Sequence, residues 1–268
     1  MSVRQTYQFE GVRGVKVGRL NQGINTQFIV YRIGDTVIDT GPSNQWRYVK
    51  GFLDSQPVSQ LLLTHHHEDH SGNADRIAKQ YGLTPKAPKL AQVKLSNGYK
   101  TPLMQKIVWG SPRPVDTQAL KETEFLSNGE KIIPVHTPGH AKDLTCFYLP
   151  QRAYFFSGDL FISRKLKLLR SDENLQQILD SIDKVLTLDF NILFCPHGGI
   201  QEKGKRVLKE KRDNIYQTCE VAQKYQKQGL SLEAITEKVL GPEDMIAKIS
   251  GGNFSKRNLI REALSIPL

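Results

Sequence analysis

The stretch Thr64-His65-His66-His67-Glu68-Asp69-His70 decides the fold and the chemistry expected of this chain. It follows the apolar run Leu61-Leu62-Leu63, which predicts a buried strand. If the period of two of a strand continues, His65 and His67 point to the same side and could chelate one metal ion together. Asp69 and His70, on the turn that follows, could then reach an adjacent position, and His66 points away.

The other chemically suggestive residues also follow predicted strands. They stand in His136-Thr137-Pro138-Gly139-His140, Phe156-Ser157-Gly158-Asp159-Leu160 and Cys195-Pro196-His197-Gly198-Gly199. Loops at strand ends converge on ligand sites in α/β proteins, so we expect these segments to meet. His140 is then a third imidazole for the first metal, and His197 completes the second. A carboxylate after an aromatic strand is costly to bury unless it is paired or metal-bound, which makes Asp159 a candidate bridge between two metals. His136 is expected to be structural.

In combination, these elements resemble the metallo-β-lactamase superfamily over about residues 10–200. The HxHxDH motif matches at His65, His67, Asp69 and His70, and the early Asp-x-Gly element matches at Asp39 and Gly41. The HTPGH, SGD and late PHG elements match at 136–140, 157–159 and 196–198. The resemblance implies an α/β fold, the αββα sandwich of two packed mixed β-sheets with outer helices.

The resemblance also implies a dinuclear site at one edge of the sandwich. His65, His67 and His140 would hold one divalent metal ion, Asp69, His70 and His197 the other, and Asp159 would touch both. Zn²⁺ is the first choice, with Fe and Mn as alternatives, because imidazole and carboxylate ligands suit all three. A hydroxide bridging the two ions would attack an ester-like bond, since two cations lower the pKa of a shared water. Asp69 is the expected catalytic residue, and Asp39 is expected to orient a metal-binding histidine.

Several helices and strands are predicted around these motifs. Strands are expected at 14–18, 26–33, 36–38, 61–63, 131–135, 145–149, 153–156 and 192–195. Helices are expected from a cap at Ser43 or Asn44 to Leu53, at 71–81 before Gly82, at 173–186 and at 202–228, and after caps at Ser231 and Ser255. Residues 83–118, with five prolines, predict an irregular segment such as a substrate lid, or a pair of weak helices. We expect a catalytic domain at 1–201 and a C-terminal helical extension at 202–268 that packs on it.

The composition sets the expected compartment and redox state. No apolar run approaches the roughly 20 residues that span a bilayer, and the first residues lack a signal-peptide core, which predicts a cytoplasmic protein with no membrane partner. The three cysteines show no CxxC spacing, so reduced and mostly buried thiols are expected. The formal net charge of +10 could attract an anionic substrate.

The substrate is less closely determined than the chemistry. We expect a hydrolase that acts on a thioester or lactone of a small molecule, which could be anionic. Glyoxalase II-type thioesterases share the ligand set, although Pro196-His197-Gly198-Gly199 departs from their local sequence. An alternative is an endoribonuclease of the same fold, to which the basic stretches 164–170 and 203–212 could attract RNA; their other interpretation is a solvated amphipathic surface. A mono-iron sulfur dioxygenase is a remoter alternative, and a homodimer is an open option.

Overall fold

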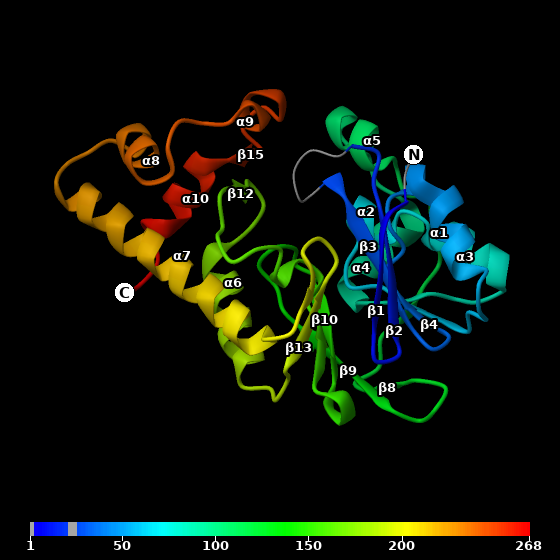
Figure 1. The fold of residues 1–268 in the computed structure, drawn as a ribbon. Helices are drawn as coiled ribbons and strands as arrows, with labels where there is room; N and C mark the ends of the chain where they lie inside the picture. Colours follow the sequence, from blue (N-terminus) through cyan, green and yellow to red (C-terminus); the bar gives the residue numbers. More distant parts are fainter. Residues whose placement is uncertain (1–2, 21–25) are drawn as a thin grey trace.

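Figure 1 shows two β-sheets packed together, with helices on both outer sides. The computed structural model describes residues 3–20 and 26–268. Within these described residues, the larger sheet has seven strands in chain order. They are β1 (Val3–Phe9), β2 (Val12–Val17), β3 (Phe28–Ile33), β4 (Thr36–Ile38), β5 (Gln60–Leu62), β6 (Lys86–Ala87) and β7 (Gln118–Ala119). Pairing is antiparallel from β1 to β4 and parallel from β4 to β7, so the sheet is mixed.

The second sheet has the strand order β14-β13-β11-β10-β9-β8. Its strands are β8 (Glu124–Phe125), β9 (Lys131–His136), β10 (Thr145–Leu149), β11 (Tyr154–Phe156), β13 (Ile192–Cys195) and β14 (Gly199–Gln201). Within this second sheet, β11–β13 is the one parallel pair among the described strands, so this sheet is mixed too. A separate two-stranded ladder joins β12 (Leu169–Arg170) to β15 (Phe254–Ser255).

Alternation along the strands explains why there are four layers. In β10, Phe147 and Leu149 face the core between the sheets, whereas Cys146 and Tyr148 face an outer core. Strand β3 alternates in the same way, with Ile29 pointing between the sheets. Strands with two apolar faces must be covered on both sides, which is the reason that they read as continuous apolar runs.

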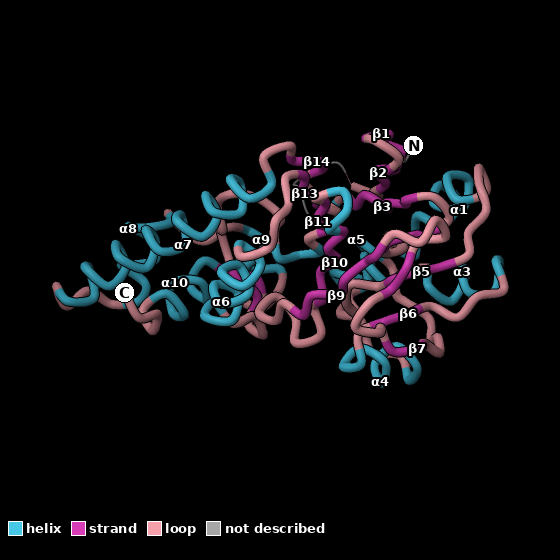
Figure 2. The backbone as a smooth tube through the Cα atoms, turned by 90° about the horizontal axis from the view of Figure 1, so that it is seen from below, coloured by secondary structure: helices cyan, strands magenta, loops and turns pink. Residues whose placement is uncertain are grey.

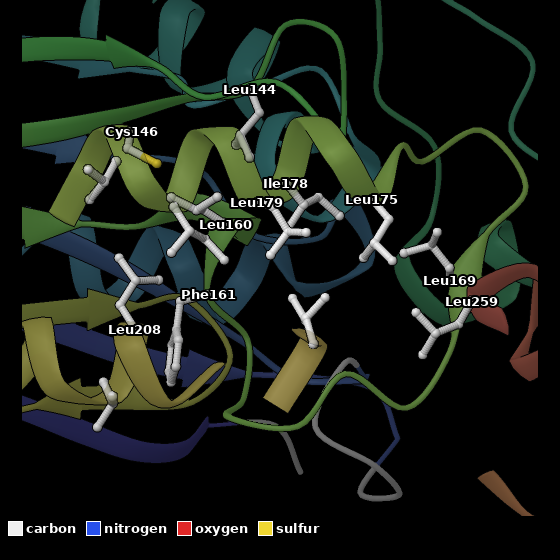
Figure 3. Packing of buried hydrophobic residues seen from close by; sticks show 14 of the residues in the cluster. Leu144, Cys146, Leu160, Phe161, Leu169, Leu175, Ile178, Leu179, Leu208 and Leu259 are labelled. Carbon is white, nitrogen blue, oxygen red and sulfur yellow. The ribbon is translucent and has the colours of Figure 1, made fainter. Parts of the chain in front are cut away.

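Helices cover the two outer faces. The first sheet is covered by α1 (Trp46–Leu53), α3 (Ala74–Tyr81) and α4 (Lys89–Asn97). The second is covered by α6 (Leu175–Leu186) and α7 (Gly204–Lys227). Helices α8 (Leu232–Leu240) and α10 (Lys256–Ala263) pack against α7 and extend the same apolar cluster. Figure 3 shows Leu175, Ile178 and Leu179 of α6 packed near Leu144 and Leu160. The expected αββα sandwich of two mixed sheets with outer helices is therefore confirmed, with helices at its C-terminal end.

The C-terminal helices lie on one side of the molecule, beyond the sheets. Figure 2 shows α7 running outward from the sandwich, with α8 and α10 beside its outer part. The short helix α9 (Met245–Ile249), which the sequence did not predict, precedes β15. The division of the chain at residues 201 and 202 stays a prediction.

Several local predictions can be compared directly with the structure. Helix α3 ends at Gly82 with a φ of 63°, and the side chains of Ser231 and Ser255 cap α8 and α10, as predicted. The cap expected at Ser43 or Asn44 is wrong, because these side chains instead donate to the carbonyls of Trp109 and Val108. A 3₁₀ turn, η2 (Ser43–Gln45), stands there before α1.

The segment 83–118 is more regular than an irregular loop. It contains α4 and α5 (Leu103–Trp109), both of which begin directly after a proline. The alternative of two short helices is therefore correct. The predicted helix at 71–81 is also divided, because α2 (Glu68–Ser71) ends before α3 begins.

Two global expectations can also be checked. All three cysteines are buried free thiols, as predicted. Across residues 3–20 and 26–268, none of the helices combines the length and the apolar character needed to cross a membrane.

Candidate metal centre

The motif residues come together in segments that follow strands of both sheets. The first histidines follow β5, His140 lies between β9 and β10, and His197 lies between β13 and β14. Asp159 belongs to the 3₁₀ turn η4 (Gly158–Leu160), which follows β11. Strand β5 ends at Leu62, so His66 lies in the loop that follows and not in a strand. Its ring points away from the centre because it contacts Asp143.

The first imidazole set is tightly clustered. Nδ1 of His67 lies 3.0 Å from Nε2 of His65 and 3.0 Å from Nε2 of His140. His65 and His67 are fully or almost fully buried, and His140 is 9% exposed. Three imidazole nitrogens that face one another across such short distances suit a single divalent cation.

Asp159 lies between this set and the second one. Its Oδ2 is 3.2 Å from Nε2 of His140. Its Oδ1 is 3.1 Å from Nε2 of His70 and 3.2 Å from Nε2 of His197. One carboxylate thus presents one oxygen to each set, which is the geometry that a bridging ligand requires.

Asp69 completes the second set. Its Oδ2 lies 3.6 Å from Nε2 of His197, and its Oδ1 lies 4.0 Å from Nε2 of His70. Groups of three donor atoms within 4.8 Å of one another are formed by residues 65, 67 and 140, by residues 65, 70 and 159, and by residues 69, 70 and 197. These groups contain all seven ligands expected from the sequence.

Unsatisfied polar atoms support the interpretation as a metal centre. Nε2 of His70, Nε2 of His197 and Oδ1 of Asp159 are buried, and none makes a hydrogen bond of acceptable geometry with the described residues. Such atoms cost free energy in a protein interior unless another partner satisfies them. Since all three point at the same space, a divalent cation fits there.

Asp39 holds the start of the motif in place. Its Oδ1 accepts from the backbone N–H of Thr64, and its Oδ2 accepts from the Thr64 hydroxyl, both at 2.8 Å. Oδ2 also lies 2.8 Å from Nδ1 of His70. Asp39 has a φ of 56°, a region that aspartate and asparagine tolerate better than most residues. The expected contact with a motif histidine is present, and it leaves Nε2 of His70 free to face the centre.

The remaining imidazoles are oriented in similar ways. The backbone carbonyl of Gln27 lies 2.9 Å from Nδ1 of His197, and the Thr64 hydroxyl lies 3.0 Å from Nδ1 of His65. The ring of Phe28 packs edge-on against His70 and His197, at centroid distances of 4.7 and 5.5 Å. The rings are therefore fixed by hydrogen bonds and by packing.

The two sets differ in their affinity for protons. Burial, together with neighbouring imidazoles, holds the pKa of His65 and of His67 well below the usual range. Burial also opposes a charge on His70, but Asp159, Asp39 and Asp69 outweigh it and raise the pKa of His70 well above that range. The pKa of Asp159 is well below its ordinary value, because three imidazoles outweigh the cost of burying its charge. The second set is thus a pocket for positive charge.

The sequence did not predict several contacts around the centre. His66 lies 2.9 Å from Asp143 through Nδ1 and 3.0 Å from the Lys94 ammonium through Nε2. His140 contacts the carboxylate of Glu173 through Nδ1. No local pattern marked Lys94, Asp143 or Glu173, because each lies far along the chain from its partner. The expected structural role of His136 is consistent with its bond to the carbonyl of Lys142 at 2.9 Å.

Five of the ten basic side chains in the stretches 164–170 and 203–212 form ion pairs with acidic neighbours. Arg206, Lys209 and Arg212 form ion pairs with Glu210, Asp213 and Asp183, respectively. In the first stretch, Arg164 pairs with Glu210 and Arg170 with Asp172, while Leu169 is buried. This arrangement favours the amphipathic surface over an RNA-binding face.

A sandwich of two sheets with a cluster of five histidines and two aspartates is typical of the metallohydrolase class of proteins. Residues 23–197 match the Metallo-beta-lactamase superfamily, which is well over half of the chain, so the chain belongs to that superfamily.

Solved structures agree with the fold. A beta-lactamase domain protein from Burkholderia ambifaria has a TM-score of 0.75 at 17% identity, covering 97% of this chain and 87% of that one. A metallo-beta-lactamase family protein from Thermus thermophilus has a TM-score of 0.67 at 16% identity, covering 95% and 91%. Both likenesses extend over nearly the whole chain, and hence over the C-terminal helices.

Relatives identified by sequence match about two thirds of the chain. A lactamase-like protein from Pestalotiopsis microspora is 29% identical over 66% of this chain and 50% of its own length. An atrochrysone carboxyl ACP thioesterase from Aspergillus fumigatus is 25% identical over 72% of this chain and 56% of its own length. The chain spans about half the length of the curated relatives it matches.

Proposed function

We propose that this chain is a metal-dependent hydrolase that cleaves a thioester of a small molecule with the help of two divalent cations, zinc in the first instance. The observation that carries the proposal is the position of Asp159, whose two oxygens face two separate sets of nitrogens within 3.2 Å. His65, His67 and His140 would hold one cation, Asp69, His70 and His197 the other, and Asp159 both. Residues 1–201 would form the catalytic domain and 202–268 its helical extension.

The choice of a thioester over a lactone or RNA is supported by two observations. Relatives include the ACP thioesterase from Aspergillus fumigatus and a protein named thioesterase pkgB from Emericella nidulans. The ion pairs formed within the two basic stretches favour a small substrate over a nucleic acid.

The chain's own residues supply positioning and proton transfer. When bound, the cations would lower the pKa of a water molecule and polarise the scissile carbonyl. The Asp69 side chain, 11% exposed, borders the centre and would accept the proton of the attacking water and return it to the leaving group. The exposed Lys94 contacts His66, whose ring lies 4.7 Å from that of the proposed ligand His67. A positive charge near the metal centre would attract an anionic group on the thioester substrate.

The test combines metal analysis with a comparison of substrates. The purified protein should hold about two equivalents of transition metal and should hydrolyse an acyl thioester faster than a lactone or a single-stranded RNA. Asp69→Ala should abolish this activity and leave the fold intact, whereas Asp54→Ala, at an exposed surface pair with Lys50, should change neither.

Three results would contradict the proposal. The first is a folded, metal-supplemented protein that holds far less than one equivalent. The second is full activity in the Asp69 variant. The third is RNA cleavage that exceeds thioester hydrolysis and weakens steeply with salt, which would favour a nuclease.

A further inference from the structure

The turn between β12 and α6 carries a carboxylate that reaches the metal centre from outside the motifs. Glu173 contacts Nδ1 of His140 through Oε1. Its Oε2 accepts from the backbone N–H of Arg170 at 2.8 Å, and its own N–H donates to the Arg170 carbonyl at 3.2 Å. The backbone N–H of Asn174 donates to the carbonyl of Gly139 at 2.9 Å. Glu173 therefore connects the loop of His140 to the turn at 170–174.

We propose that Glu173 is a positioning residue for His140, and that C-terminal residues 253–262 support the metal centre because they hold the turn that carries Glu173. The proposal rests on the proposed function, in which His140 is a metal ligand. A carboxylate that accepts from Nδ1–H leaves the lone pair of Nε2 facing the centre. Both side chains are only 10% exposed, so a carboxylate there needs the partners that it has.

Backbone pairing ties the turn to the C-terminal part of the chain. Leu169 pairs with Ser255 and Arg170 pairs with Phe254 in the β12–β15 ladder. Ser171 then continues this contact, since its N–H and its hydroxyl donate to the carbonyl and the side-chain oxygen of Asn253 at 2.9 and 2.7 Å. The turn that carries Glu173 thus directly follows strand β12, whose partner strand β15 is C-terminal.

Side chains reinforce the same connection. The amide of Asn258 donates to the carbonyl of Leu169 at 3.3 Å, and Glu262 accepts from the N–H of Leu175 at 3.3 Å. Leu169, Leu175 and Leu259 are buried in one apolar cluster, at the same end of the view in Figure 3. Helix α10 therefore holds the segment on both sides of Glu173.

The direct test is Glu173→Gln. Glutamine keeps the shape but has one oxygen, so its amide NH₂ must face either the Arg170 N–H or Nδ1 of His140. A backbone N–H can only donate, whereas an imidazole can move its proton to its other nitrogen. We therefore expect the oxygen to face Arg170 and the NH₂ group to face Nδ1, which favours the wrong tautomer of His140. We expect one of the two zinc-binding steps to weaken by about 10- to 100-fold in a chelator competition titration, with the other step unchanged. Asp172→Asn is the matched control, because the Asp172 carboxylate pairs with Arg170 and is 60% exposed.

A second variant tests the role of the C-terminal part. Asn253→Ala removes the side-chain contact with Ser171 but touches no proposed ligand. It should weaken the same zinc-binding step, by less than Glu173→Gln, and urea unfolding should show that the fold is retained.

A readout without metal separates this inference from the proposed function. Long-range ¹H–¹⁵N spectra of the metal-free protein should show His140 as the Nδ1–H tautomer, and this preference should be lost in Glu173→Gln. Wild-type protein that binds no zinc overturns the proposed function and this inference with it. Wild-type zinc binding with unchanged steps and tautomer in Glu173→Gln overturns the role of Glu173 alone. An unchanged zinc titration in Asn253→Ala overturns the role of the C-terminal part.

Discussion

Asp39→Asn tests whether the orientation of an imidazole, rather than its presence, sets the affinity of the centre. The native carboxylate serves three donors, the N–H and the hydroxyl of Thr64 and Nδ1 of His70, all at 2.8 Å. Asparagine has the same shape and tolerates the positive φ of 56°, so the backbone need not move. The amide has one oxygen, and the Thr64 N–H requires it. The NH₂ group must then face Nδ1 of His70.

The expected magnitude follows from this conflict. An Nδ1 atom that faces an NH₂ group must become an acceptor, so the proton of His70 moves to Nε2, where the second cation would bind. The variant loses a charge-assisted hydrogen bond, which contributes about 1.5–3 kcal/mol. That range agrees with the roughly 10- to 100-fold loss of metal affinity typical when such a hydrogen-bond partner is removed, or about 1.4–2.7 kcal/mol.

The assay is a zinc titration against a chromogenic chelator, read as two binding steps. One step should weaken in Asp39→Asn and the other should stay within a few-fold of wild type. Asp35→Asn is the matched control, because it makes the same change at the opposite end of β4, where Asp35 bonds to Ser59. Two unchanged zinc-binding steps in Asp39→Asn would refute the reasoning about the tautomer.

Two further predictions concern stability. Burial lowers the pKa of Lys211, whose ammonium donates to the carbonyl of Leu160 at 2.6 Å. Between this lowered pKa and about 10.4, the unfolded chain therefore binds more protons at Lys211 than the folded chain does. The free energy of unfolding of the wild type should rise with pH in that range relative to that of Lys211→Met. A difference between the two proteins that is the same in urea unfolding at pH 7 and at pH 9.5 would contradict this. Phe194 is buried between the sheets and stacks on Phe156 at a ring-centroid distance of 4.6 Å. Phe194→Ala should therefore lower the free energy of unfolding by about 3–5 kcal/mol. Phe125→Ala, at a position 54% exposed, should lower the free energy of unfolding far less. Equal losses in the two variants would mean that packing between the sheets is not how Phe194 stabilises the fold.

The spacing of residues predicted most of the centre because its ligands follow strands directly. His65 and Asp159 come three residues after the ends of β5 and β11, and His197 comes two residues after the end of β13, so these segments could be located from short patterns. The caps at Ser231 and Ser255 were equally local, since each bonds to a backbone N–H three residues later. Local chemistry is what a single sequence expresses well.

Contacts between distant segments could not be predicted in the same way. Ser43 and Asn44 have the side chains of capping residues, but α5 offers them carbonyl acceptors 66 and 64 residues away. Strands β12 and β15 have two residues each, too short for any periodicity, and they form because tertiary packing brings them together. Glu173 was expected only as the first residue of a helix, yet its side chain is used by His140.

The four imidazoles that present Nε2 to the centre are oriented in the same way. Each has its Nδ1 near an oxygen of the polypeptide: His65 near Thr64, His70 near Asp39, His140 near Glu173 and His197 near the carbonyl of Gln27. These oxygens come from residues that flank β3 and β4 of the first sheet, from the motif loop, and from the turn held by residues 253–262. Because each fixes a ring before any cation binds, the cost of ordering the ligands is met when the chain folds. Destabilising any of these three regions should therefore weaken metal binding before it unfolds the protein.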